Sequence, residues 1–344
     1  MNEIRVSQAL GFLQRQLAID LGTANTRIYV GGGGIVLNEP SVIARERDDD
    51  SVLAVGNAAE ELMGREPEKI EVLRPLTSGV IADFAGAKIM LETFIRRASG
   101  RWHLSQPEAM VTVPSGATST EQRAVIDLGR RAGLKNTYLI ASGVAAALGA
   151  GLPVIEPKGQ MIIDIGSETT EIVVMSLGGV VASRSVRLGG ANITEAIMRS
   201  IKRIHGVQIG SGSAEEAKRL IGSVADKAKY KMKVHGRASV KGKPQTLQLT
   251  SKDLKPTLES NLERIVLAAR GVLEKTPPDL VSDIVENGMT ISGGGAQLDG
   301  LGKYLEDKLH TAVKLAQDPQ LCAAKGAFIA ITHLNDYKRS LLGI

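Results

Sequence analysis

The sequence contains one motif twice, and this duplication constrains the possible folds more than any other feature. The two copies are residues 17–29 (LAIDLGTANTRIY) and 161–172 (MIIDIGSETTEI). In each copy a short apolar run ends in Asp and is followed by Gly, small hydroxylated residues and a second β-branched run. This pattern predicts a strand, a tight turn and a returning strand. Because glycine in such a turn lets backbone N–H groups approach an anion, we expect two similar turns that hold a di- or triphosphate from both sides.

Carboxylates and a further glycine segment complete the expected phosphate site. Asp20 and Asp164 end the first strand of each copy, where a hydrated Mg²⁺ needs carboxylates. A third glycine segment follows an apolar strand predicted over 289–292 and precedes a predicted helix. In this context glycine lets a ligand reach the helix N-terminus. We interpret this segment as the nucleoside side of the same site, formed by Gly293, Gly294 and Gly295.

Hairpins, strands and crossover helices alternate in both halves of the chain, which predicts an α/β protein of two similar lobes with the nucleotide in the cleft between them. A chain of 344 residues is long enough for two cores. The expected divisions are an N-terminal amphipathic segment over 1–16, lobe I over 17–152 plus 316–344 with a small insertion over about 31–73, and lobe II over 153–315 with an insertion over about 189–250.

Cysteine usage and hydropathy favour one compartment. The single cysteine, Cys322, excludes an internal disulfide framework and suits a reducing cytoplasm. We expect it to be a buried small hydrophobic residue. No apolar run reaches the ~18–20 residues needed to span a bilayer, and the N-terminus shows no cleavable signal pattern. The sequence therefore predicts a cytoplasmic protein.

The charge of the chain is mildly basic. A formal net charge of +5 permits acidic partners without requiring one. The most basic segment, 226–255, has no aromatic ladder of the kind that binds nucleic acid, and a charge run usually forms a solvated face. We therefore expect no nucleic-acid partner.

Two segments have the composition of membrane contacts, and each also has a purely structural interpretation. On a helical wheel, residues 1–16 gather apolar side chains on one face, which suits an interfacial helix on a membrane, a helix packed on the body of the protein, or a frayed tail. A loop after residue 99 mixes apolar and Arg side chains, which suits a headgroup interface or a local packing anchor. The apolar residues concerned are Val6, Leu10, Leu13, Trp102 and Leu104.

Motifs spread over nearly the whole chain carry a resemblance to a known family. They are AIDLGTANT (18–26), GIVLNEPSVIA (34–44), GVIADF (79–84), TVPSG (112–116), AALGAGLP (146–153), DIG followed by TTE (164–171), SLGGVV (176–181) and SGGGAQL (292–298). This succession resembles the MreB family, the bacterial actin homologues of the actin/Hsp70/sugar-kinase superfamily. The resemblance implies a two-lobed actin-like (ribonuclease H-like) fold that binds ATP or ADP with Mg²⁺ and polymerises into membrane-bound filaments directing cell shape.

The same resemblance assigns site residues by position. The first phosphate loop would be formed by Asp20, Gly22, Thr23, Ala24 and Asn25. The second would be formed by Gly166, Ser167, Glu168 and Thr169. Glu215 and Lys218, which share one face of a helix predicted over 214–228, would contact ribose and adenine. Gly293–Gly295 match the adenosine motif, and Asp20 and Asp164 would hold Mg²⁺ through water.

Three departures from the family pattern lie around the expected phosphates. The family's IEEP reads IASG here, so neither Ala141 nor Ser142 supplies the carboxylate that orients the attacking water. The family's DIGGGTT reads DIGSETT, so Ser167 and Glu168 replace glycines. The basic residue that usually precedes the GVIAD segment is also missing, and Thr77 lies there instead.

Glu168 has the largest expected effect on affinity. A carboxylate ~4–5 Å from a phosphate charge costs at most ~3–4 kcal/mol at an effective dielectric of ~20, about a thousandfold in affinity. The cost falls where Glu168 turns to solvent or pairs with a metal or a lysine. Together the departures predict a divergent member whose ATP hydrolysis is weak or absent and which still binds nucleotide through the first phosphate loop and the adenosine side.

Three functions compete on this basis. The first is a cytoskeletal protein that assembles with itself at the inner face of the cytoplasmic membrane. The family resemblance implies antiparallel paired protofilaments, with the helix over 119–131 near the pairing face. The second is a non-polymerising regulator that co-assembles with an active MreB and cell-shape membrane proteins. The third is a kinase or Hsp70-like ATPase, against which the missing catalytic carboxylate counts. Longitudinal contacts are dispersed surfaces, so the sequence leaves the first two open.

Overall fold

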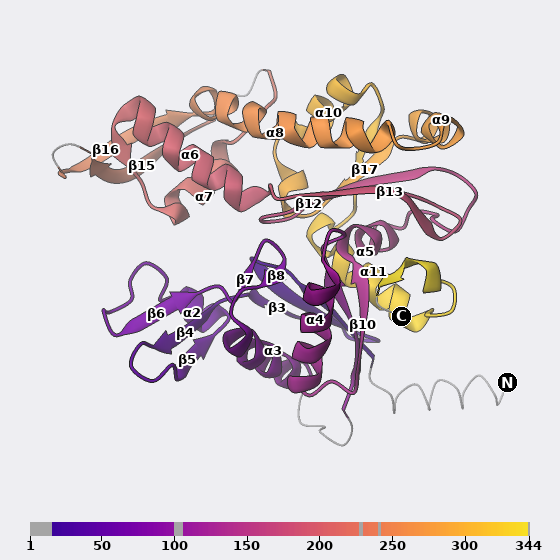
Figure 1. Ribbon diagram of the computed structural model, residues 1–344. Helices are drawn as coiled ribbons and strands as arrows, with labels where there is room; N and C mark the ends of the chain where they lie inside the picture. The colour runs from indigo at the N-terminus through magenta and orange to yellow at the C-terminus, as the bar shows by residue number, and fades with distance from the viewer. Residues whose placement is uncertain (1–15, 100–105, 227–229, 240–241, 343–344) are drawn as a thin grey trace. The chain divides into compact units, whose positions relative to one another are not determined.

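The computed structural model describes residues 16–99, 106–226, 230–239 and 242–342, and these form two compact units (Figure 1). Of the described residues, unit 1 contains those up to 157, those in 175–180 and those from 321 onward, and unit 2 contains those in 158–174 and 181–320. The chain therefore enters unit 2 just before the second copy of the duplicated motif, and its C-terminal part returns to unit 1.

Unit 1 is organised around a six-stranded sheet in the order β19-β10-β9-β1-β2-β3. The strands are β1 (Gln16–Leu21), β2 (Asn25–Val30), β3 (Gly34–Pro40), β9 (Glu108–Val113), β10 (Asn136–Ala141) and β19 (Leu341–Leu342). The first three form an antiparallel meander, while β1, β9 and β10 run parallel to one another. The first copy of the motif is thus the β1–β2 hairpin, as predicted.

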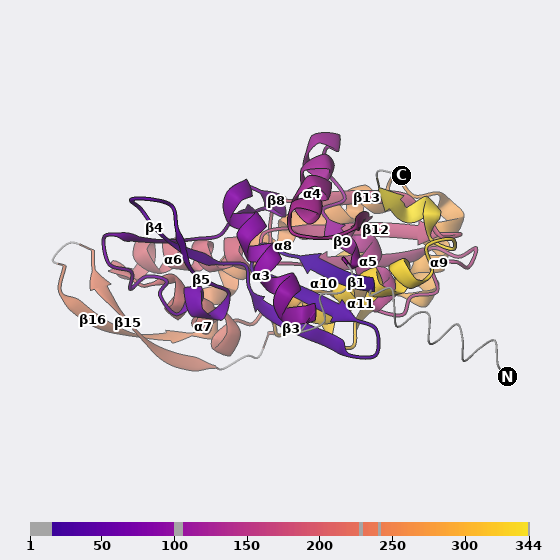
Figure 2. The same ribbon diagram turned by 90° about the horizontal axis from the view of Figure 1, so that it is seen from below.

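Helices pack on this sheet because its strands alternate their side chains between two faces. The helices are α3 (Phe84–Ser99), α4 (Ser119–Arg131), α5 (Ser142–Gly149) and α11 (Cys322–Thr332). Leu17, Ile19 and Leu21 of β1 belong to one buried cluster with Met90 and Phe94 of α3. In Figure 2, α3 lies across the strands β1 and β3.

Two of these helices, α5 and α11, approach each other through small residues. A Cβ at Gly149 would lie 1.9 Å from the Cys322 carbonyl oxygen, and one at Gly326 would lie 1.7 Å from the Ala145 oxygen, so only glycine fits at either position. The Cys322 side chain is fully buried in this contact, which confirms its predicted packing role.

A smaller part of unit 1 lies between β3 and α3. It contains β4 (Ile43–Glu46), β5 (Val52–Val55), α2 (Asn57–Glu60), β6 (Ile70–Leu73), β7 (Leu76–Thr77) and β8 (Val80–Ile81). The sequence over 74–84 (RPLTSGVIADF) predicts the opening of a helix that runs to about residue 99. This prediction is wrong at its start, because residues 74–83 contain the β7–β8 hairpin and α3 begins at Phe84. Its first turn is capped by Asp83, whose carboxylate accepts the Gly86 N–H at 3.0 Å.

Unit 2 repeats the plan of unit 1 with a five-stranded sheet in the order β13-β12-β11-β17-β18. The strands are β11 (Gln160–Ile165), β12 (Thr170–Ser176), β13 (Gly179–Val186), β17 (Met289–Ser292) and β18 (Val313–Leu315). Here too the first strand is central, its hairpin partner lies on one side, and parallel strands lie on the other. The second copy of the motif is the β11–β12 hairpin.

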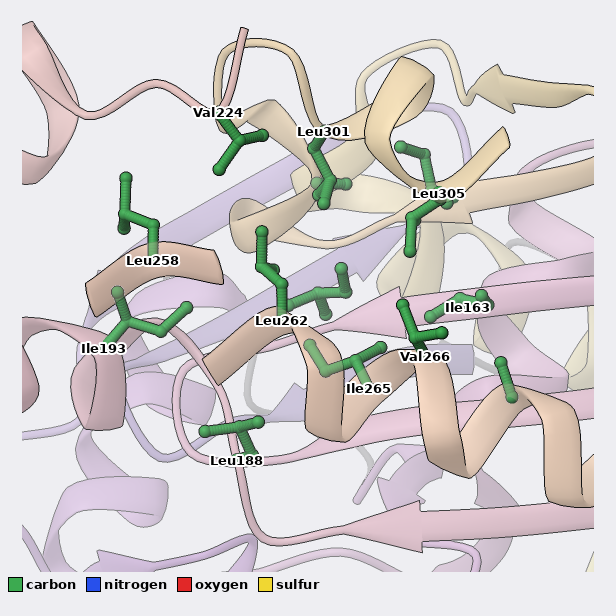
Figure 3. Packing of buried hydrophobic residues seen from close by; sticks show 14 of the residues in the cluster. Ile163, Leu188, Ile193, Val224, Leu258, Leu262, Ile265, Val266, Leu301 and Leu305 are labelled. Atoms are coloured by element: carbon green, nitrogen blue, oxygen red, sulfur yellow. The ribbon is translucent and has the colours of Figure 1, made fainter. Parts of the chain in front are cut away.

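The core of unit 2 is aliphatic, in a chain whose aromatic residues make up only 3% of the sequence. Its helices are α6 (Gly190–His205), α7 (Ser211–Ile221), α8 (Ser251–Leu273), α9 (Pro278–Asn287) and α10 (Leu301–Leu309), and its smaller sheet contains β14 (Val207–Gln208), β15 (Lys231–Ala238) and β16 (Pro244–Thr250). Figure 3 shows Leu262, Ile265 and Val266 of α8 in the same buried cluster as Ile163 of β11 and Leu305 of α10.

Two helix predictions in unit 2 were incomplete. The helix predicted over 214–228 ends earlier, because α7 stops at Ile221 and Gly222 closes it with its N–H bonded to the Ala217 and Lys218 carbonyls, both at 3.1 Å. Helix α9 was missed, although its Pro–Pro–Asp start is a helix N-terminus signal.

The segments with the composition of membrane contacts lie outside the described residues. Val6, Leu10 and Leu13 fall in 1–15, and Trp102 and Leu104 fall in 100–105. Among the residues that are described, no helix is both long and apolar enough to cross a membrane. The membrane contacts stay a prediction.

Candidate functional site

The turn of the first hairpin, between β1 and β2, depends on a glycine. A Cβ at Gly22 would lie 2.7 Å from the Asn25 carbonyl oxygen, closer than side chains tolerate, so the backbone can close this turn only with glycine. The predicted first phosphate loop, Asp20 with Gly22–Asn25, is therefore one tight loop at the end of β1.

Side chains from distant segments hold this turn in place. The Ser41 hydroxyl donates to the Gly22 carbonyl oxygen at 2.6 Å, and the Ser41 N–H donates to the Ala24 oxygen at 2.9 Å. Arg74 donates to the same Ala24 oxygen at 3.0 Å. The Thr23 hydroxyl accepts the Gly79 N–H at 2.9 Å. The carbonyl groups that would repel a phosphate are thus occupied by donors of the protein itself.

Asp20 lies beneath this turn and is almost fully paired. Its Oδ2 accepts from Arg27 Nη1 at 3.0 Å, and its Oδ1 accepts from the Thr112 hydroxyl at 2.9 Å, while that hydroxyl also accepts the Leu21 N–H at 3.2 Å. The Asp20 side chain is only 12% exposed and that of Arg27 only 13%. Both carboxylate oxygens therefore have donors, one of them cationic, and the arrangement does not suit a hydrated Mg²⁺ at this carboxylate.

The turn of the second hairpin, between β11 and β12, repeats the glycine contact of the first. A Cβ at Gly166 would lie 3.0 Å from the Thr169 carbonyl oxygen. The same oxygen accepts the Gly166 N–H at 2.8 Å. In both hairpins the glycine two residues after the Asp thus lies close to the carbonyl oxygen three residues later, so the two turns share this close backbone contact.

The second turn is held by the N-terminus of α6. The Gly190 N–H donates to the Gly166 carbonyl oxygen at 3.0 Å, and the Ala191 N–H donates to the Ser167 oxygen at 2.7 Å. The backbone φ angles of Ser167 and Glu168 are both negative. The two side chains that replace family glycines therefore fit this turn without backbone strain.

Lys218 of α7 supports the first turn of α6. Its Nζ donates to the Gly190 carbonyl oxygen at 2.9 Å, to the Thr194 hydroxyl at 3.0 Å and to Glu215 Oε2 at 2.6 Å. Burial lowers the pKa of Lys218, against the opposing effect of Glu215. The ammonium has three protons and three acceptors, so it positions the strand–helix junction, while Glu215 remains 45% exposed.

The third glycine segment packs against the end of β11. A Cβ at Gly293 would lie 2.3 Å from the Ile165 carbonyl oxygen, and one at Gly295 would lie 2.3 Å from the Ile165 side chain. Gly293 also has a φ of +83°. Of the three, only Gly294 is exposed, and a Cβ there would meet nothing nearer than the Gln320 side chain at 4.0 Å. Gly293 and Gly295 are thus needed for packing, and Gly294 is the one with room for a ligand.

The remaining predicted positions lie at strand ends. Asp164 accepts a hydrogen bond from the Ser292 hydroxyl at 2.7 Å, which joins β11 to β17. In unit 1, the Ser142 hydroxyl donates to the Val113 carbonyl oxygen at 3.0 Å, and Ala141 is buried at the start of α5. Thr77 is exposed in β7. Among the described residues there is no group of three or more His, Cys, Asp or Glu side chains that could hold a metal ion.

Several residues that shape the site were missed in the sequence. Thr112, Ser41 and Ser292 are far along the chain from the turns they support, and no local pattern marks them. Arg27 could have been found, because in the β1–β2 hairpin it lies directly opposite Asp20 in the antiparallel register.

The two sheets, each with a central strand that opens into a glycine hairpin, define an actin-like protein. The chain belongs to the MreB/Mbl family, whose model, described as MreB/Mbl protein, matches residues 14–339.

Relatives and a solved structure support this assignment. The chain is 39% identical over 322 residues to the cell shape-determining protein Mbl of Bacillus subtilis, covering 93% of this chain and 97% of that one. It is 44% identical over 323 residues to the cell shape-determining protein MreB of Escherichia coli, covering 92% and 93%. The crystal structure of MreB5 of Spiroplasma citri bound to AMPPNP matches with a TM-score of 0.89 at 32% identity, covering 94% and 97%.

Proposed function

We propose that this protein is an actin-like filament protein that binds ATP or ADP and hydrolyses ATP slowly or not at all. The observation that carries the proposal is a contact shared by the two turns. A Cβ added at Gly22 or Gly166 would lie 2.7 or 3.0 Å, respectively, from the carbonyl oxygen three residues later, so each turn closes tightly around its glycine. In both turns, carbonyl oxygens accept from donors of the protein, which suits turns whose N–H groups meet phosphate.

The comparisons support nucleotide binding. MreB5 of Spiroplasma citri has been solved with AMPPNP and also with ADP, the latter matching with a TM-score of 0.89 at 33% identity. We assign the phosphates to the turn residues Gly22–Asn25 and Gly166–Thr169, the ribose to Glu215 and the adenosine to Gly294. Lys218 acts by holding α6 against the second turn.

Slow hydrolysis follows from the start of α5. Phosphoryl transfer to water needs a group that positions the water, and this is most of what a protein contributes to the reaction. The side chains at Ala141 and Ser142 are a methyl group and a hydroxyl that is already bonded to the Val113 carbonyl oxygen. We expect the actin-like fold to be used here for nucleotide-linked assembly more than for turnover.

Self-assembly and membrane attachment complete the proposal. The relatives in Bacillus subtilis and Escherichia coli are both named as cell shape-determining proteins. By family, the filament would lie at the inner face of the cytoplasmic membrane, with contacts from the N-terminal segment 1–16 and from the loop that carries Trp102 and Leu104. Co-sedimentation with anionic lipid vesicles, with and without these segments, tests the attachment.

Three measurements on the purified full chain test the rest. Isothermal titration calorimetry with ATP and with ADP should show binding, sedimentation should show nucleotide-dependent assembly, and phosphate release should stay far below that of an ordinary MreB measured in parallel. Absence of ATP binding would overturn the proposal. Binding without assembly would instead identify a regulator that joins filaments of another MreB, and turnover like that of the ordinary MreB would refute slow hydrolysis.

A further inference from the structure

Arg27 lies beside Asp20, one of the two carboxylates expected to hold Mg²⁺, and an Mg²⁺ site would not require an arginine there. It lies on β2 directly opposite Asp20 of β1, and its Nη1 is 3.0 Å from the Asp20 Oδ2. The side chains are 13% and 12% exposed, so the pair is largely shielded from water. At this short range and with little screening, the charge of Arg27 dominates the environment of the carboxylate.

The second oxygen of Asp20 is also engaged. The Thr112 hydroxyl donates to Oδ1 at 2.9 Å while accepting the Leu21 N–H at 3.2 Å, so the hydroxyl proton is directed to the carboxylate by its other bond. A hydrated Mg²⁺ at Asp20 would have to share the carboxylate with Arg27 and would meet its like charge. The Asp20 carboxylate already has a cationic partner, the Arg27 guanidinium, which is part of the same chain.

Arg27 also keeps capacity for another acceptor. Its Nε is buried and has no hydrogen-bond partner among the described residues. A guanidinium carries five N–H donors in a fixed plane and favours the oxygens of carboxylates and phosphates. A nucleotide bound at the neighbouring turn would therefore meet an aspartate whose charge Arg27 already neutralises, beside an Nε–H that has no partner among the described residues.

We propose that Arg27 takes the place of Mg²⁺ as the cation at Asp20, so that nucleotide binding by this chain depends little on divalent cations. The inference rests on the proposed function, since it concerns how the same site balances the charge of ATP. Arg27 is a charge-balancing and positioning residue, and no step of hydrolysis is assigned to it.

The experiment is calorimetric titration of ATP into the full-length protein with excess MgCl₂ and, separately, with EDTA. The wild type should lose less than about threefold in affinity when Mg²⁺ is removed. Arg27→Leu, which frees the carboxylate, should make the loss about tenfold or more. Arg27→Lys keeps a positive charge and should stay near the wild type.

Arg45→Leu is the matched control, because Arg45 is also a partly buried strand arginine paired with carboxylates, Glu71 and Asp83, in unit 1. It should leave the Mg²⁺ dependence unchanged. A wild type that loses tenfold or more in EDTA overturns this inference while leaving nucleotide binding intact, whether or not Arg27→Leu folds. No ATP binding under either condition overturns the proposed function and this inference with it.

Discussion

The two hairpins begin with the same backbone and are then stabilised in different ways. The first turn is held by the side chains of Ser41, Arg74 and Thr112 and by the backbone N–H of Gly79, and its aspartate is paired with Arg27. The second turn is held mainly by backbone N–H groups at the start of α6. A duplicated motif can therefore keep its turn geometry while its two copies come to depend on different residues.

The contrast is sharpest at one motif position. Arg27 follows Asp20 by seven residues, and the residue at the same spacing after Asp164 is Glu171. Glu171 is 1% exposed and accepts from the Ser185 hydroxyl at 2.6 Å. Opposite charges thus occupy equivalent places in the two hairpins, so a divalent cation would find a different environment at each aspartate.

The largest expected effect is the loss of the arginine from the first hairpin. Arg27→Leu leaves the carboxylate of Asp20 buried without its ionic partner, and we expect the free energy of unfolding to fall by about 3 kcal/mol. Urea unfolding measures the change. Adding Asp20→Asn in the same chain should recover part of the loss, since the amide needs no cation. A loss in Arg27→Leu below about 0.5 kcal/mol, as for exposed pairs, would show that the pair is not shielded.

The next largest expected effect is the loss of stability when the turn glycine of each hairpin, Gly22 or Gly166, is replaced by alanine. Gly22→Ala places a Cβ 2.7 Å from a backbone oxygen and Gly166→Ala places one at 3.0 Å. We expect losses of about 2 and about 1 kcal/mol respectively, because overpacking against backbone costs more the closer the approach. Gly302→Ala, where a Cβ meets nothing within 4 Å on α10, is the control and should be neutral or stabilising. Equal losses at Gly22 and Gly166 would mean that the two turns are equally adaptable.

Glu168 tests whether the second turn has been closed to phosphate by charge. Glu168→Gln keeps the size of the side chain and removes its charge, so we expect ATP affinity to rise about tenfold, below the full Coulomb figure because the side chain is partly exposed. Calorimetry on the variant and the wild type measures this. Glu216→Gln on α7 is a charge-matched control. Unchanged affinity in Glu168→Gln would show that Glu168 points away from the bound phosphate.

Much of the fold was predictable because the decisive signals are local. Strand–Gly–strand patterns gave both hairpins, and the Thr118 and Glu121 capping box that marks α4 is present with both of its hydrogen bonds. The helix predictions failed where a single glycine or proline sets the end or the start of a helix, as at Gly222 after α7 and at the start of α9. Such ends depend on a few backbone bonds that a periodic pattern does not contain.

The site was predictable only as far as the turns. Gly22 and Gly166 were identified from the motif, but the partners of Asp20 come from β2 and from β9, more than ninety positions away in the case of Thr112. Gly293 and Gly295 were assigned to a ligand, and their close contacts with Ile165 are a packing requirement that only the register of β11 and β17 reveals. Long-range pairing is the part that one sequence does not specify locally.

The smallest expected effect concerns the support of the second turn. Lys218→Met removes the ammonium that bonds the Gly190 oxygen and the Thr194 hydroxyl, and we expect a loss of about 1 kcal/mol near neutral pH. Because burial lowers the pKa of Lys218 below its usual 10.5, the unfolded chain binds more protons than the folded one between the two values. The stability contributed by this site therefore rises with pH through that window, and the difference between the wild type and Lys218→Met should grow as the pH rises from neutral toward the unfolded pKa of 10.5. Lys303→Met on α10, where ion pairs raise the pKa of an exposed lysine, should show no such growth. A constant difference for Lys218→Met would mean that its ammonium is solvated and that α6 holds the second turn without it.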